Sequence, residues 1–113
     1  MEAEGPQLAE AWVERRQYRR VRLVTQVHCH ALERHEMLVT RDVSVGGMFI
    51  NVQNPLPVDS DLSLTFRLDP AQPAITCRAK VAFSRNGLGM GVQFLDLSFD
   101  LRQMIQAFVD KEG

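Results

Sequence analysis

The chain has 113 residues, 45% of them hydrophobic and 24% charged, and its formal net charge at pH 7 is -1. These values are those of one globular domain with an ordinary hydrophobic core, and they exclude a disordered protein. They also argue against a broad basic surface for duplex nucleic acid, because such binding depends on many cationic contacts.

The N-terminal segment, residues 1–11, is polar and is predicted to be a flexible arm ahead of a single domain at residues 12–111. It lacks the basic-then-apolar order of a signal peptide, and no run in the chain has the apolar length of a membrane span. These features predict a cytoplasmic protein with no membrane contact. Five arginines then fall between Arg15 and Arg22, so any anionic partner should be bound at this segment.

Six segments alternate between apolar and polar residues, which is the period of a half-buried strand. They cover Val21–Ala31, Met37–Val43, Met48–Val52, Leu62–Leu68, Ile75–Phe83 and a last strand that carries Met90, Val92 and Phe94. A polar turn at Glu33–His35 separates the first two. Gly46-Gly47 suits a tight connection, for which a positive φ is one option, and Asn86-Gly87 is the strongest hairpin signal in the sequence.

The C-terminal segment changes from the period of a strand to that of a helix. Ser98 is a suitable N-cap, and the apolar residues after it have the spacing of one helical face. They are Leu101, Met104, Ile105, Phe108 and Val109. Six short antiparallel strands followed by this helix predict an all-β fold with a C-terminal helix, packed on a small barrel. Cys29 and Cys77 fall on the apolar phase of strands and are expected to be reduced core residues.

Other patterns that often mark chemistry are interpreted here as structural. His28 and His30 share a strand face and, with His35, suggest a metal, but two histidines without a neighbouring cysteine fit surface imidazoles better. The glycines of segment 87–91 lie in a hairpin and a strand, not between a strand and a helix, which excludes a dinucleotide fingerprint. We therefore expect no catalytic residue, no metal site and no cofactor, and the chain is not expected to be an enzyme.

Two polar motifs remain, and they indicate a binding site. The first is Arg15-Arg16-Gln17-Tyr18-Arg19-Arg20, before the first strand, and the second is Asp42-Val43-Ser44-Val45-Gly46-Gly47, at the end of the next. Arginine forks match guanine edges and phosphates, and glycines let a backbone come close to a ligand. Together they predict a site for a small, anionic, guanine-bearing molecule. Separately, each has a plainer explanation: a solvated strand lead-in, and a hairpin in which Asp42 and Ser44 bond turn amides.

The two motifs resemble the signatures of the PilZ domain family, bacterial receptor modules for cyclic di-GMP. Those signatures are an RxxxR run ahead of the first strand and a (D/N)xSxxG run after the second. Arg16–Arg20 and Asp42–Gly47 satisfy them. Arg15–Arg19 has the same spacing, but the Arg16–Arg20 register is preferred because its second arginine directly precedes the first strand. The segment Gly89–Phe94 also resembles the closing strand of the family.

This resemblance spans Trp12 to Val109 and implies a six-stranded antiparallel PilZ-like β-barrel with the ligand on its outer face. Arg16 and Arg20 would engage guanine O6 and N7, and Arg15 or Arg19 could equally pair with a phosphate. Asp42 would accept from guanine N1–H and N2. The Ser44 hydroxyl would donate to the ligand, and Gly47 would let it approach a backbone N–H. The predicted ligand-binding residues are Arg15, Arg16, Arg19, Arg20, Asp42, Ser44, Gly46 and Gly47.

The resemblance further implies a cyclic di-GMP receptor whose arginine-rich arm orders on binding and changes the surface seen by a protein partner. The partner would belong to the motility or secretion machinery, with motility, pili or exopolysaccharide as the output. One alternative is a ligand-independent PilZ-type adaptor. A second, ranked last, is a barrel for single-stranded nucleic acid, for which Tyr18 and Phe49 are the aromatic candidates. Phe83 stands where some family members carry a tryptophan near the ligand, but its apolar phase equally suits the core.

Overall fold

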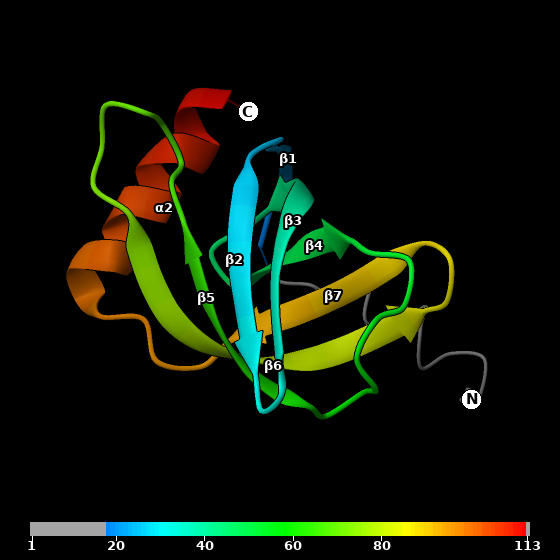
Figure 1. Ribbon diagram of the computed structural model, residues 1–113. Coiled ribbons are helices and arrows are strands. Elements are labelled where there is room, and N and C mark those ends of the chain that lie inside the picture. The colour runs from blue at the N-terminus through cyan, green and yellow to red at the C-terminus, as the bar shows by residue number, and fades with distance from the viewer. Residues whose placement is uncertain (1–17, 113) are drawn as a thin grey trace, which may run out of the picture.

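The computed structural model describes residues 18–112, which form seven strands and one helix (Figure 1). The predicted arm at residues 1–11 lies outside the described residues. The elements are β1 (Val21–Arg22), β2 (Gln26–Ala31), β3 (Arg34–Val43), β4 (Gly47–Asn51), β5 (Asp61–Phe66), β6 (Ile75–Arg85), β7 (Gly89–Phe94) and α2 (Phe99–Glu112). No helix within residues 18–112 is both long enough and apolar enough to cross a membrane.

The strands form one sheet that closes on itself. Their order is β1-β3-β2-β5-β6-β7-β4, every pairing is antiparallel, and β4 also pairs with β3. Strands β2 to β7 therefore make a closed six-stranded barrel, and the two-residue β1 continues the line of β2 along one side of β3. This confirms the predicted fold class. Closure gives the polar backbone groups of each barrel strand partners on both sides.

The first predicted strand is divided in two, because the side chain of Thr40 interrupts its pairing with β3. The Thr40 hydroxyl donates to the Leu23 carbonyl oxygen at 2.5 Å and accepts the Thr25 N–H at 3.1 Å. Between β1 and β2 the register with β3 shifts by one residue. The predicted alternation nevertheless holds across the break, since Leu23 and Val27 are buried while Val24 is exposed.

The hairpin between β2 and β3 is tighter than predicted. Ala31 pairs with Arg34 and His30 with His35, so the turn contains only Leu32 and Glu33. The expected turn at Glu33–His35 is therefore wrong at its C-terminal end. The polar residues that suggested it lie in a strand, because this end of the hairpin is only half-buried or exposed and tolerates polar side chains on both faces.

The hairpin predicted at Asn86-Gly87 joins β6 to β7. The N–H of Leu88 donates to the carbonyl oxygen of Arg85 at 3.1 Å, and Gly87 has a φ of 80°. That φ is the one a type II turn requires at its third residue, which favours glycine there. The sequence signal and the structure agree on this turn.

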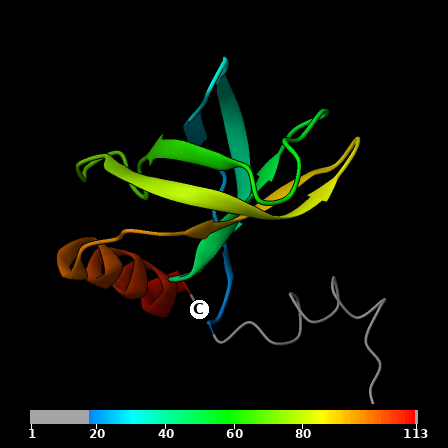
Figure 2. The ribbon, with the colours of Figure 1, turned by 90° about the horizontal axis from the view of Figure 1, so that it is seen from below.

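The core fills the barrel and extends to one face of α2. Ile105 and Val109 of the helix belong to the same buried cluster as the inward side chains of the strands, and α2 forms a layer beside the barrel (Figure 2). Ser98 caps the helix as predicted, since its Oγ accepts the Leu101 N–H at 3.2 Å. The cysteines, Cys29 and Cys77, are buried and free. Burial raises the pKa of both thiols to about 12, so they remain protonated at neutral pH.

Candidate functional site

The site is built on a β-bulge in β3. Thr40 pairs with Ile50 of β4, and Asp42 pairs with Phe49, so Arg41 is an extra residue in the ladder. A bulge changes which side chains share a face of the sheet. Thr40 is fully buried in the barrel, whereas Arg41 and Asp42 both project from its outer surface. Without the bulge, two successive residues would point to opposite faces.

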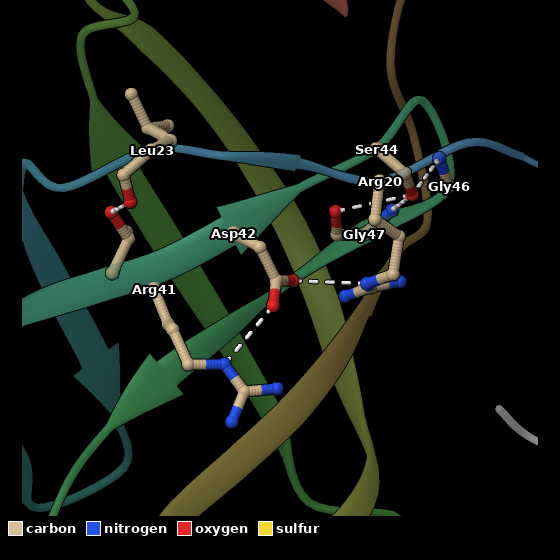
Figure 3. Close-up of polar contacts among 8 residues, drawn as sticks. Arg20, Leu23, Arg41, Asp42, Ser44, Gly46 and Gly47 are labelled. Carbon is tan, nitrogen blue, oxygen red and sulfur yellow. Dashed lines mark hydrogen bonds and ion pairs between the residues drawn. The ribbon is translucent and has the colours of Figure 1, made fainter. Parts of the chain in front are cut away.

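Asp42 lies between two guanidinium groups (Figure 3). Arg20 donates from Nε to Oδ1 of Asp42 at 2.9 Å, and Arg41 donates from Nε to Oδ2 at 3.1 Å. The side chains of Arg20 and Asp42 are only 11% and 17% exposed, whereas that of Arg41 is 53% exposed. The structure thus brings the second arginine of the preferred register against the aspartate of the other motif.

Arg19 has a different environment from its neighbour. Its guanidinium donates to the carbonyl oxygen of Val109, near the C-terminal end of α2, at 3.1 Å. A cation at this end of a helix is favourable, because the last carbonyl groups carry partial negative charge. Arg15 and Arg16, the other two arginines of the prediction, lie outside the described residues. The ligand contacts predicted for all of these arginines stay predictions.

Ser44 stabilises the turn between β3 and β4. Its Oγ accepts the N–H of Gly46 at 3.1 Å and that of Gly47 at 3.3 Å, and its own N–H donates to the Gly47 carbonyl oxygen at 2.8 Å. Ser44 is 2% exposed. These contacts are the turn-amide bonds of the plainer explanation. In this structure the Ser44 hydroxyl and the Gly47 N–H are both used inside the turn.

Both glycines of this turn are closely packed. Neither has a positive φ, so that option is wrong. A Cβ at Gly47 would overlap the carbonyl oxygen of Val92 in β7, and a Cβ at Gly46 would lie 2.7 Å from Cδ2 of Tyr18. The ring of Tyr18 therefore packs against the turn. This contact joins the arginine segment to the second motif.

Phe83 lies on the outer face of the barrel and not in its core. The register of β6 with β7 shifts between Val81 and Phe83, so the apolar phase that suited Phe83 to the core ends at Val81. Phe83 pairs with Gly91, which pairs on its other side with Phe49, the partner of Asp42. Directly opposed residues share a face. Phe83 is therefore in the same cross-strand row as Asp42.

Sequence reasoning missed Arg41 and misjudged Phe49. The Cζ atom of Arg41 lies 3.9 Å from the centroid of the Phe49 ring, in cation–π geometry. Phe49 is only 2% exposed, so it is not the open aromatic platform considered for single-stranded nucleic acid. The only signal for Arg41 in the sequence is its position directly before Asp42. Simple alternation would place it on the opposite face from Asp42.

The remaining candidates lie elsewhere. His28, His30 and His35 are exposed on β2 and β3, with ring centroids of His30 and His35 4.3 Å apart. Within residues 18–112, no three His, Cys, Asp or Glu side chains form a group able to hold a metal ion. A hollow of about 750 Å³ beside the β2–β3 turn contains Leu32 and Arg78 in its lining, but none of the predicted ligand-binding residues.

Comparison with solved structures shows which proteins share this fold. The Bacillus subtilis inhibitor of motility, MotI/DgrA, is 16% identical, with a TM-score of 0.70, and the match covers 85% of this chain and 50% of that one. The PilZ domain of YcgR from Escherichia coli, solved with c-di-GMP, is 15% identical, with a TM-score of 0.67 and coverage of 87% and 91%. The PilZ domain of CeSA from a cellulose-synthesizing bacterium is 17% identical, with a TM-score of 0.60 and coverage of 82% and 96%.

At these identities the structural likeness establishes the fold, and this chain spans half the length of MotI/DgrA. None of the curated proteins compared with the chain is similar enough in sequence to count as a relative. The sequence itself matches the PilZ domain over residues 14–111, which is most of the chain. With the barrel, the helix and both motifs in their expected order, the chain belongs to the PilZ domain family.

Proposed function

We propose that this chain is a receptor for cyclic di-GMP, with no catalytic activity. The observation that carries the proposal is the 2.9 Å contact between Arg20 and Asp42 on the outer face of the barrel. It joins the two motifs that the sequence separates by 22 positions. Family membership and the likeness to the PilZ domain of YcgR, which was solved with c-di-GMP, support the same ligand.

The chemistry of these groups suits a guanine and a phosphate. A carboxylate only accepts hydrogen bonds and has about four lone-pair positions, of which Asp42 uses two for guanidinium groups. The others can accept from guanine N1–H and N2, which together distinguish guanine from adenine. The arginine segment supplies cations for the two phosphates. Its cations are Arg20 and, from the sequence motif, Arg15 and Arg16.

Binding at this place would affect parts of the domain outside the barrel. Three successive residues hold the arginine segment: Tyr18 packs on Gly46, Arg19 bonds α2, and Arg20 bonds Asp42. A ligand that moves Arg20 would therefore change how this segment packs on the barrel and its contact with the C-terminal end of α2. We propose that a cytoplasmic protein partner of the motility or secretion machinery responds to that change and so regulates motility, pili or exopolysaccharide.

Isothermal titration calorimetry with cyclic di-GMP tests the proposal on the purified chain. We expect saturable heat, and its stoichiometry distinguishes one ligand molecule from two. Arg20→Ala should weaken binding tenfold or more, since hydrogen bonds to charged groups contribute about 1.5–3 kcal/mol. The absence of heat at tens of micromolar ligand would contradict the receptor function.

A second candidate is a ligand-independent adaptor. The observation in its favour is that the polar groups of the site already have partners within the domain: Asp42 bonds two arginines, and Ser44 bonds its own turn. These contacts hold the site together without a ligand. Once a partner is identified, its affinity with and without cyclic di-GMP separates the two functions. Equal affinity in both conditions is expected of the adaptor only.

A further inference from the structure

Arg41 lies outside both sequence motifs but is held beside the aspartate of one of them. Three features fix its side chain: the bulge that turns it outward, the Phe49 ring 3.9 Å from its Cζ, and the bond from its Nε to Asp42. Only Nε is used in that bond. Within residues 18–112, no group accepts a hydrogen bond from its two terminal nitrogens, and the side chain is 53% exposed.

This arrangement makes Arg41 a pre-organised donor. An exposed arginine usually loses much rotamer freedom when it binds a ligand, and a side chain already held in place loses less. The flat guanidinium packs on a buried ring and bonds the carboxylate, while the Arg41 side chain as a whole is half exposed. Arg20, on the other oxygen, is only 11% exposed. Of the two guanidinium groups, Arg41 is therefore the more accessible to a ligand arriving at Asp42.

The pair Arg41–Asp42 matches one edge of guanine. On that edge N2, N1–H and O6 follow in order, as two donors and then an acceptor, whereas adenine places a donor where guanine has O6. If Asp42 accepts from N2 and N1–H, the next atom is O6. When N1–H binds Oδ2, O6 lies on the side of Arg41, whose Nε bonds that oxygen at 3.1 Å.

We propose that Arg41 is a specificity-determining residue that donates to O6 of the guanine bound by Asp42. The inference rests on the proposed receptor function and extends it to a residue outside the motifs. Strand β3 would then provide both the donor and the acceptor that recognise guanine, because the bulge places Arg41 and Asp42 on the same face of the barrel. A lysine could not replace Arg41, because it would lose the flat contact with Phe49 and the fork of nitrogens.

A double-mutant cycle between protein and ligand tests this role. The ligands are cyclic di-GMP and its 6-thio analogue, in which sulfur, a weaker acceptor, replaces O6. Arg41→Met keeps an unbranched apolar side chain that reaches about as far as Nε but removes all donors. Arg78→Met is the matched control: Arg78 is also exposed, has the same charge, and lies on β6 opposite Ser63, away from Asp42. Cyclic di-IMP, which lacks N2, reports separately on Asp42.

We expect Arg41→Met to bind cyclic di-GMP about ten- to a hundredfold more weakly than wild type and to lose the wild-type preference over the 6-thio analogue. The Arg78→Met control should keep both the wild-type affinity for cyclic di-GMP and the preference over the 6-thio analogue. Discrimination against cyclic di-IMP should survive in Arg41→Met, because Asp42 is unchanged.

Three outcomes would overturn the inference. If Arg41→Met weakens both ligands equally, the arginine contacts a phosphate. If it loses discrimination against cyclic di-IMP, Arg41 only positions Asp42. If the variant binds both ligands like wild type, Arg41 has no role in binding. A wild-type chain that does not bind cyclic di-GMP at all would instead refute the proposed function, and this inference with it.

Discussion

Replacing Asp42 by asparagine tests the centre of the site with almost no change in shape. The substitution removes the negative charge that accepts from Arg20 at 2.9 Å and from Arg41 at 3.1 Å. It also exchanges one acceptor oxygen for a donor. Both the stability of the domain and its recognition of guanine should therefore change, for reasons that can be measured separately.

The expected loss of stability follows from the exposure of the two ion pairs. The Arg20–Asp42 pair is at most 17% exposed, so it should contribute near the range of about 1.5–3 kcal/mol typical of hydrogen bonds to charged groups. The half-exposed Arg41 adds about 0–1 kcal/mol. Asparagine keeps one acceptor oxygen and therefore part of this stabilising free energy. We expect a loss of about 1–2 kcal/mol, which lowers the melting temperature of a domain this size by about 5–15 °C.

Differential scanning calorimetry without ligand measures the first effect, and titration with cyclic di-GMP below both melting transitions measures the second. Binding should weaken tenfold or more, because an amide cannot accept from both guanine donors. Asp61→Asn is the control, since Asp61 is an exposed carboxylate on β5 and its replacement changes the net charge equally. A variant of Asp42 that melts and binds like wild type would refute the reasoning. A lower melting temperature with unchanged affinity would leave the ion pair structural only.

Three further predictions concern the scaffold. Gly47→Ala should cost about 2 kcal/mol or more, because its methyl group overlaps the carbonyl oxygen of Val92, and an unchanged urea midpoint would show that the strands can separate there. Ser98→Ala should cost about 1 kcal/mol through loss of the N-cap, while Ser98→Asp should not; equal loss in both would argue against capping. Burial raises the pKa of Cys29 and Cys77 from 9.0 to about 12, so the folded chain retains protons that the unfolded chain releases. Stability should therefore be complete below about pH 9 and fall as pH rises toward 12, and replacing both cysteines by alanine should flatten this fall in urea titrations.

Periodicity predicted the barrel well, because strands such as β2 and β5 alternate between buried and less buried residues along their length. It could not predict the irregular positions, since these depend on pairing between distant segments. The bulge at Arg41 and the register shift before Phe83 both change the face on which later residues lie. The break after β1 is made by Thr40, 15 positions beyond Thr25. Nothing near Thr25 in the sequence carries that information.

The resemblance predicted that the two motifs would meet, and Arg20 and Asp42 do meet. The sequence could not separate the roles of neighbouring arginines, because Arg19 is distinguished only by a helix 90 residues later in the chain. It also could not distinguish a hydroxyl that binds a ligand from one that holds a turn. Ser44 is only 2% exposed and holds the turn, and its burial follows from the folded barrel and not from the local sequence.

The closed pairing of the barrel restricts how this domain can transmit a signal. A strand with neighbours on both sides cannot slip by one residue without breaking two ladders and turning its apolar side chains outward. The barrel therefore serves as a fixed frame, and displacement is confined to the elements attached to it, the segment before β2 and α2. Amide hydrogen exchange should accordingly change at these attachments on ligand binding and stay constant in the strands.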